Sequence, residues 1–460
     1  GLLQAALEHG DREQVGRLKS KLARQERSAK ERPFGLSTPS SRRPVKPSLP
    51  GMDEAEIRRR KGGASPGHAG HGWKTPEGPA PEAEELAAPD TCPCCGGALA
   101  DFPGGAEDVR DLVDCHPLPA FRRRVRVPAR HCPHCRKPVR PRVPGVLPKT
   151  RLTNNVIARA ASEHYLDGVP MGTVARRLGV GKGTLLNASH RLAQIVRPVS
   201  EGLRGLLREA AVRRADETPW RTDGDNGYAW VFLAGRVRVF ACEDTRSMSV
   251  PEAVLADSAG SLVTDRYAAY NRFRGRRGYC LEHLRRDTPE TVGKNPRSAE
   301  CAAFADALVP WLREAMSLRS ACAGDPAAYL VRAAFIRRRI EAVAEAPARH
   351  PSVQHIQNIF RENADRLWLW TEGPRIPAEN NAAERAIRPL AVARKVSHGS
   401  QSDRGRKTRS VLMSVLHTLA ARCVDPAQHL ARAPDRFAED PGTDMFSAVF
   451  GGLPLYMPTQ

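Results

Sequence analysis

The stretch ADETPW at residues 215–220 is the first of three short acidic segments that decide the fold class of this chain. The second segment is VTDRY at residues 263–267, and each of the two follows an apolar or β-prone run. These runs predict that Asp216 and Asp265 project from strand ends onto one rim of a sheet.

The third segment, NNAAER at residues 380–385, has a different pattern. Its Asn pair suits helix capping and is followed by good helix formers, which places Glu384 on a helix. Two strand-borne aspartates and one helix-borne glutamate can chelate a pair of divalent ions, and their hard oxygens suit Mg²⁺ or Mn²⁺. Two such ions roughly 3.5–4 Å apart can stabilise the attacking and leaving oxygens of an in-line phosphoryl displacement. The three segments therefore predict chemistry that cuts and rejoins nucleic acid.

A single acidic side chain proves little in a chain with 51 Asp and Glu residues, so the residues around each acid carry the specificity. ADETPW, then TDRYAAYN at 264–271, then NNAAERAIRPL at 380–390 resemble, in this order, the catalytic segments of the sixty-six family of insertion-sequence transposases. The resemblance extends over about residues 92–430. It implies an α/β fold with an RNase H-like core, in which the Asp-Asp-Glu triad consists of Asp216, Asp265 and Glu384.

The same resemblance implies a DNA transposase that cleaves a strand at the ends of an insertion sequence and joins the freed 3′-hydroxyl to target DNA. Its expected partners are double-stranded DNA, further copies of the chain in a multimer on that DNA, and accessory transposition proteins. Two alternatives stay open. One is an RNase H-like nuclease that cleaves without strand transfer, and the other is an inactive or domesticated DNA-binding regulator.

Charge and composition favour a polyanionic partner. The chain has 72 Lys and Arg residues, a formal net charge of +21 and a pI near 10.0. Residues 121–151 contain eleven basic residues and no acidic one, and residues 385–409 contain eight basic residues against Asp403. The sequence has neither an eighteen-residue apolar stretch nor a signal-peptide pattern, so we expect a protein of the bacterial cytoplasm at the nucleoid, with no membrane segment.

Composition shifts and periodicity divide the chain into six expected parts. Residues 1–31 form a helix whose partial apolar stripe suits a short coiled coil or self-association, and residues 32–90 form a flexible linker rich in Pro, Gly, Ser and Ala. The remaining parts are a zinc-binding domain at 91–150, a helical helix-turn-helix region at 151–210, a catalytic domain at 211–430 with a helical insertion at about 298–370, and a tail at 431–460.

Two Cys-x-x-Cys pairs predict a structural zinc site. The pairs are Cys92 with Cys95 and Cys132 with Cys135, each with Pro after its first Cys, and 36 residues separate them. Each pair can form a knuckle that supplies two thiolates, and together they give a closed tetrahedral Zn²⁺ site. The alternatives are free cysteines, or substitution of a ligand by Cys94, Cys115, His116 or His134. The run at 121–127 alternates apolar residues with arginine, which predicts a strand with a basic face for DNA.

Residues 155–195 have a helical pattern with helix-turn-helix character. Gly179 supplies the turn, and Val174, Leu178, Val180 and Leu185 are expected to pack the two helices together. The residues expected to contact DNA are Arg176, Arg177, Lys182, Thr184 and Asn187. An ordinary pair of helices remains the alternative.

Beyond residue 211 the pattern predicts three strands, a helix at 250–257 and the strand that ends at Asp265, with a hairpin around Gly235. This order suits an RNase H-like core. Because 118 residues lie between Asp265 and Glu384, far more than a minimal core needs, we expect an inserted helical subdomain.

Two further groups of side chains are expected near the triad. Cys280 and His283 form a Cys-x-x-His pair, in which His283 supports the triad or positions a phosphate while Cys280 packs; a core histidine is an equal alternative. Arg388 lies one helical turn from Glu384 on the same face. The basic tract continues through Arg394, Lys395, His398, Arg404, Arg406 and Lys407, and all of these residues are assigned to phosphate binding near the active site.

Overall fold

The computed structural model describes residues 82–101, 107–115 and 120–454, all of which belong to one compact unit at residues 54–460. The helix predicted at 1–31 and most of the predicted linker lie outside the described residues. Within the described ranges no helix is long and apolar enough to cross a membrane.

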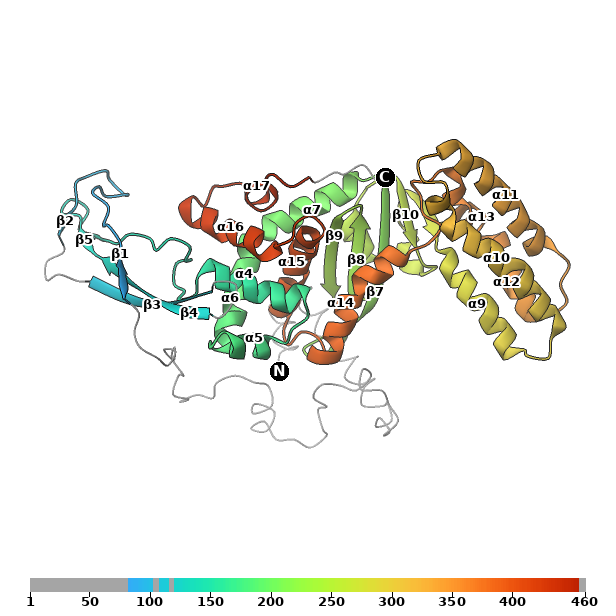
Figure 1. Cartoon of the computed structure of the whole chain (residues 1–460), viewed down its shortest axis with the longest axis horizontal. Coiled ribbons are helices and arrows are strands. Elements are labelled where there is room, and N and C mark those ends of the chain that lie inside the picture. The colour runs from blue at the N-terminus through green and yellow to red at the C-terminus, as the bar shows by residue number, and fades with distance from the viewer. Residues whose placement is uncertain (1–81, 102–106, 116–119, 455–460) are drawn as a thin grey trace, which may run out of the picture. The chain divides into compact units, whose positions relative to one another are not determined.

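A mixed five-stranded sheet carries two of the three acidic segments (Figure 1). Its strand order is β11-β10-β7-β8-β9, in which β7, β8 and β9 form an antiparallel meander and β10 runs parallel to both β7 and β11. Helix α8, Ser249–Leu255, leads from β9 to β10, so the predicted order of three strands, a helix and a strand is confirmed. The strands are β7 Val212–Thr222, β8 Asp225–Ala234, β9 Val237–Glu243, β10 Ser261–Thr264 and β11 Arg276–Tyr279.

The prediction that Asp216 projects from a strand end is wrong, because Asp216 lies inside β7. Strand β7 pairs with β10 only as far as Arg214, opposite Val263, but continues beside β8 to Thr222. The long hairpin with β8 therefore extends β7 past the end of its parallel neighbour. Continuing the parallel register by two residues brings Asp265 level with Asp216 at that step in the sheet.

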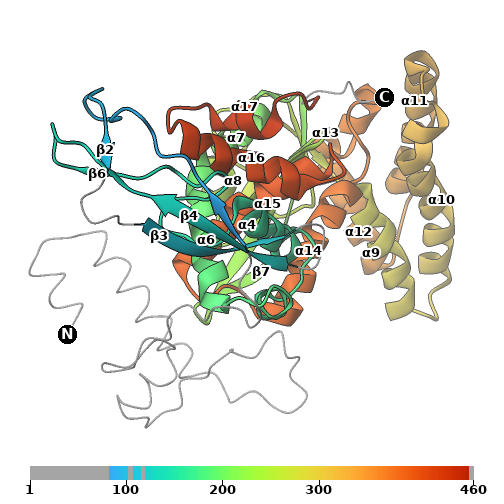
Figure 2. The ribbon, with the colours of Figure 1, turned by 60° about the vertical axis from the view of Figure 1, so that its left-hand side comes forward.

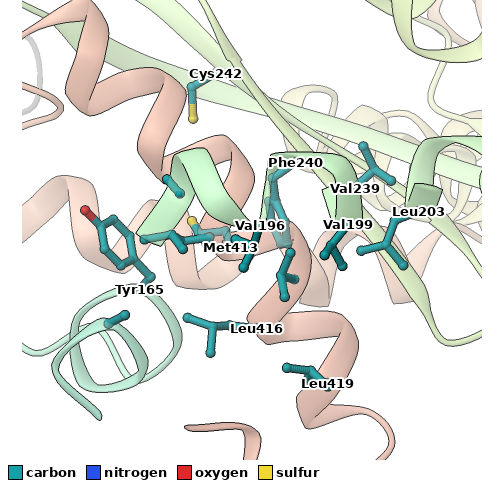
Figure 3. Close-up of a cluster of buried hydrophobic side chains, with 14 of the residues drawn as sticks. Tyr165, Val196, Val199, Leu203, Val239, Phe240, Cys242, Met413, Leu416 and Leu419 are labelled. Atoms are coloured by element: carbon teal, nitrogen blue, oxygen red, sulfur yellow. The ribbon is translucent and has the colours of Figure 1, made fainter. Parts of the chain in front are cut away.

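Helices from both ends of the described chain pack against this sheet. Helix α14, Asn381–Ser397, contacts β7 and β8, whereas α7, Arg197–Glu209, and α15, Asp403–Ala420, contact β9 (Figure 1). Figure 3 shows part of the resulting core, where Val199, Leu203, Phe240 and Leu416 meet from these helices and β9. The other elements of this body are α4 Asn154–Ala161, the π-helix η2 Ser162–Leu166, α5 Met171–Arg177, α6 Lys182–Ile195, η3 Ala268–Tyr270, α16 Pro426–Glu439 and α17 Met445–Phe450.

Helix α15 covers the outer edge of the sheet at β9. The backbone N–H groups of Arg238, Phe240 and Cys242, which alternate along the strand, donate to Thr418 Oγ1 at 3.0 Å, Ser414 Oγ at 2.8 Å and Ser410 Oγ at 2.9 Å. The three hydroxyls are four residues apart on one face of the helix. They match the period of the strand because two strand residues and four helix residues both span about 6–7 Å. An edge that would otherwise expose unpaired donors is thereby closed.

Residues between β11 and α14 form a helical body with its own hydrophobic core, which includes Leu308, Ile336 and Ile356. The predicted helical stretch at 298–370 is observed, and the helices begin earlier, at Leu281. The elements are α9 Leu281–Lys294, α10 Ala299–Ala321, α11 Pro326–Glu345, α12 Pro351–Glu362, α13 Ala364–Leu367 and η4 Leu369–Glu372.

The cysteine-containing segment consists of one long hairpin, β3 with β4, and several short strands (Figure 2). The run predicted as a strand at 121–127 is β4, Ala120–Pro128, which pairs with β3, Glu107–Cys115, and with β1, Ala83–Glu85. Strand β1 contradicts the prediction of a flexible linker through residue 90. Its Glu84 forms an ion pair with Arg123 of β4. The positive charge of β4 therefore helps to hold the acidic strand β1 in place beside it. The remaining strands are β2 Ala100–Asp101, β5 Arg130–His131 and β6 Pro138–Val139.

Candidate active site

Asp216 lies in β7, and Asp265 follows the end of the neighbouring strand β10. Asp216 Oδ1 accepts the backbone N–H of Glu217 at 2.9 Å. Asp265 directly follows β10, and its Oδ1 accepts the backbone N–H of Tyr267 at 2.9 Å. Burial and the nearby carboxylates of Glu217, Asp265 and Glu384 raise the pKa of Asp216 to about 7. The carboxylates of Asp265 and Glu384 both contribute to this shift, so the three acids of the predicted triad belong to one region of the fold.

Asn380 joins the start of α14 to the sheet. Its side-chain Nδ2 donates to the Ala215 carbonyl oxygen at 2.7 Å, and its backbone N–H donates to Cys280 Sγ at 3.1 Å. Asn380 holds the N-cap position, but its side chain does not cap the helix as predicted, and Glu379 accepts the N–H of Asn381 instead. Because Asn380 is only 1 % exposed, its amide serves to hold α14 beside the residue before Asp216.

Glu384 has two carboxylate oxygens in different surroundings. Its Oε2 accepts from Arg286 Nη2 at 3.1 Å, and Arg286 Nε also donates to Glu282 at 3.0 Å. Its Oε1 is buried and has no hydrogen-bond partner within the described ranges. The ligand atoms of Glu384, Cys280 and His283 lie within 4.8 Å of one another, so the Cys-x-x-His pair does adjoin the third acid. Burial raises the pKa of Cys280 to about 12, which favours the neutral thiol.

A partly buried ionic cluster around Glu217, next to Asp216, was not predicted from the sequence. Glu217, the residue after Asp216, accepts from Arg246 Nη2 at 2.7 Å and from the Tyr270 hydroxyl at 2.6 Å. Arg246 also stacks on Tyr267, with its guanidinium carbon 3.8 Å from the ring centroid. Since Tyr267 N–H binds Asp265, this cluster ties the loop after β10 to β7. In the sequence, the only indication of this cluster was Glu217, the second acid of ADETPW.

The chemistry of the three acids, rather than a measured geometry, suits divalent cations. No basic side chain of the described ranges forms an ion pair with Asp216 or Asp265, although both lie in a site crowded with negative charge. Burial and mutual repulsion raise the pKa of Asp216, and Glu384 presents a buried oxygen without a donor. A cation bound by these oxygens would offset the repulsion between the carboxylates and would give the buried oxygen of Glu384 a partner. A set of ligands made only of carboxylates suits Mg²⁺ or Mn²⁺.

The four predicted zinc ligands converge. Cys92 Sγ lies 3.6 Å from Cys135 Sγ, Cys95 Sγ lies 3.7 Å from Cys132 Sγ, and all four sulfurs lie within 4.8 Å of one another. A tetrahedron with Zn–S bonds of about 2.3 Å has edges of about 3.8 Å, so the four thiols fit Zn²⁺. Hydrogen bonding to Cys132 is the main cause that raises the pKa of Cys135 to about 12, and a divalent cation would relieve this crowding of thiols.

The residues expected to contact DNA fall into two groups. On α5 and α6, Arg176, Arg177, Lys182, Thr184 and Asn187 are all exposed, while Val174, Leu178 and Leu185 are buried between the helices. Gly179 adopts φ +65° in the turn, which favours glycine.

On α14, Arg388 and Lys395 are exposed, but Arg394 is engaged by the sheet. Its Nη1 donates to the Pro219 carbonyl oxygen at 2.7 Å and to Thr218 Oγ1 at 3.1 Å. Arg394 therefore ties α14 to β7 in addition to any contact it makes with a phosphate.

A sequence profile described as the Transposase IS66 family matches residues 149–408, more than half of the 460-residue chain. The matched segment contains Asp216, Asp265 and Glu384 and begins after the four clustered cysteines. A search of curated proteins finds no match.

Proposed function

The chain belongs to the IS66 family of transposases, and we propose that it cleaves DNA at insertion-sequence ends and transfers the freed 3′-hydroxyl to target DNA. The observation that supports the proposal is the placement of the three acids: Asp216 lies in β7, Asp265 follows the neighbouring β10, and Glu384 lies on a helix that Asn380 tethers to the same sheet. An inactive regulator would have no need to keep the carboxyl of Asp216 buried beside other acids, which raise its pKa.

The strand order supports an RNase H-like core in this proposal. Three antiparallel strands followed by a helix and two strands parallel to the first give the order β9-β8-β7-β10-β11, with the proposed catalytic acids at β7 and after β10. The helical body between β11 and α14 is then the insertion that separates the second acid from the third.

The proposed reaction consists of two in-line displacements at phosphorus. Water first attacks a phosphodiester at the element end and releases a 3′-hydroxyl, which then attacks a phosphodiester of target DNA. Mg²⁺ or Mn²⁺, when bound by the three acids, would stabilise the attacking and leaving oxygens. Asn380 and the Glu217–Arg246 cluster hold the acids in position, and Arg286 neutralises Glu384 before a cation is bound.

The remaining assignments follow from charge and exposure. Helices α5 and α6 would act as a helix-turn-helix that presents Lys182, Thr184 and Asn187 to double-stranded DNA, and Zn²⁺ would stabilise the unit that contains β3 and β4. Self-association on DNA, accessory transposition proteins, location at the bacterial nucleoid and the division of the chain into functional domains belong to the same proposal.

Glu384→Gln tests this function because it keeps the shape of the side chain and removes the charge that would hold a cation. We expect Mg²⁺-dependent cleavage and strand transfer of an end-containing duplex to fall by at least about 10³-fold, while binding of the same duplex persists. The matched control is Glu362→Gln, an exposed residue of α12 outside the site. Near-normal strand transfer by Glu384→Gln would refute the triad, and wild-type cleavage without joining would favour the nuclease.

A further inference from the structure

A cavity of about 340 Å³ lies beside the proposed active site, between η2, α14 and α15. Its charged lining consists of Arg385, Arg388 and Arg409 against the single acid Asp167. This volume lies at the lower end of the range of about 300–1,000 Å³ that small-ligand pockets occupy, so it suits a group the size of a nucleotide.

Arg409 is a buried cation without an anion. It is 5 % exposed, and no carboxylate of the described residues forms an ion pair with it. Its Nη2 lies 3.0 Å from His164 Nε2, and its guanidinium carbon lies 5.1 Å from the Tyr165 ring centroid and 4.9 Å from that of Trp220. Burying an uncompensated charge is costly, so a guanidinium held in this way at a cavity wall indicates that an anion completes the site.

His164 does not supply the missing negative charge. Burial and then the charge of Arg409 lower the pKa of His164 to about 4, which leaves the ring neutral. Its Nδ1 lies 2.8 Å from the Val169 carbonyl oxygen and must donate to it, so Nε2 accepts from Arg409. His164 thus orients the guanidinium without neutralising it. It is held in the π-helix η2, a helix type that recurs at functional sites.

The cavity continues the site around α14. Arg388 is one helical turn from Glu384 on the same face of α14, whereas Arg385 points about 100° away around the helix. Both arginines line the cavity, so a DNA strand that passes Glu384 and Arg388 can enter it and reach Arg385. Both side chains are exposed, and neither forms an ion pair within the described part of the chain. Tyr165 and Met413 form the inner wall, where Figure 3 shows the Tyr165 hydroxyl pointing away from the aliphatic core.

We propose that this cavity binds one nucleotide of the DNA strand next to the reacting phosphodiester, with its phosphate held by Arg385, Arg388 and the buried Arg409. The inference deepens the proposed function and rests on it for the identity of the strand. Arginine binds phosphate oxygens strongly, through charge-assisted hydrogen bonds that are often bidentate. The cavity lining has three arginines and one acid, Asp167, so its net charge is positive.

The test measures binding without catalysis, in buffer free of divalent metal other than the structural zinc. Arg409→Met and the double variant Arg385→Ala/Arg388→Ala are titrated with an end-containing duplex, and Arg338→Ala, an exposed arginine of α11, is the matched control. We expect both pocket variants to lower duplex affinity about tenfold or more, with the salt dependence falling by about one unit of slope for each arginine–phosphate pair that is removed. The control should bind as the wild type does.

Thermal unfolding separates a ligand site from a packing role. Arg409→Met should keep or raise the Tm, because it removes an unpaired buried charge, and pyrophosphate should raise the Tm of the wild type but not of the double variant. If Arg409→Met does not fold, the duplex affinity of the Arg385→Ala/Arg388→Ala variant tests the inference, because both of its substitutions are at exposed positions. Normal duplex affinity in the double variant overturns the inference, even if pyrophosphate still binds the wild type, because the cavity would then hold a small free anion. That result would leave the Glu384→Gln test of the proposed function intact.

Discussion

Replacing Asp216 by Asn should stabilise the protein without divalent metal, and more so as the pH rises. The pKa of Asp216 rises from 3.8 to about 7, roughly three units, because the carboxyl is largely buried among other acids. At about 1.36 kcal/mol per unit, the ionised carboxylate destabilises the fold by up to about 4 kcal/mol. Solvent screening makes this an upper limit.

The pH dependence follows from the linkage between protonation and folding. The folded state binds a proton more tightly than the unfolded state, so this contribution to stability is fully present below pH 3.8 and is lost as the pH rises through about 7. Asn carries no charge at any pH, so the variant does not lose stability as the pH rises through this range. The difference in stability between Asp216→Asn and the wild type should therefore be small at about pH 4 and approach its limit at about pH 8.

The assay is thermal unfolding at several pH values in buffer stripped of Mg²⁺ and Mn²⁺. At about 2–4 °C per kcal/mol for a large domain, the Tm advantage of Asp216→Asn near pH 8 should be several degrees and at most about 16 °C. Mg²⁺ should raise the Tm of the wild type at that pH but not that of the variant. The control is Asp223→Asn in the exposed β7–β8 turn. Parallel pH profiles for the wild type and Asp216→Asn would refute the crowded-acid site.

Two further predictions concern the zinc unit and the covered edge of the sheet. Cys132→Ser should reduce zinc from one per chain to near zero by elemental analysis and unfold the strands around it, while the core beyond residue 211 keeps its unfolding transition; retained zinc would contradict the four-cysteine site. Ser414→Ala should lower the free energy of unfolding by about 1–3 kcal/mol in denaturant, because the buried Phe240 N–H loses its acceptor. Ser317→Ala at an exposed position of α10 is the matched control, and equal stabilities of the two variants would show that the covered edge contributes nothing.

The sequence by itself determined the local features of this protein. Alternating apolar residues and arginines predicted β4, because a half-buried strand repeats every two residues, and apolar runs on both sides of Gly235 predicted the β8–β9 hairpin. The spacing of the two Cys-x-x-Cys pairs predicted the four sulfurs that converge, since a knuckle needs only a short local turn. The residues around the three acids indicated the family, which the match to residues 149–408 confirms.

Only the tertiary structure decided how distant segments meet. Asp216 lies inside a strand because β8 extends β7 beyond β10, and strand pairing is not encoded near Asp216 itself. The amide of Asn380 looked like a helix cap but binds Ala215, 165 residues away in sequence. Arg409 looked like one more residue of a basic tract, yet the fold buries it at a cavity wall. The burial of a side chain and the partners of its polar atoms depend on how the whole chain folds. These two properties distinguish a side chain that only stabilises the fold from one that can bind a ligand.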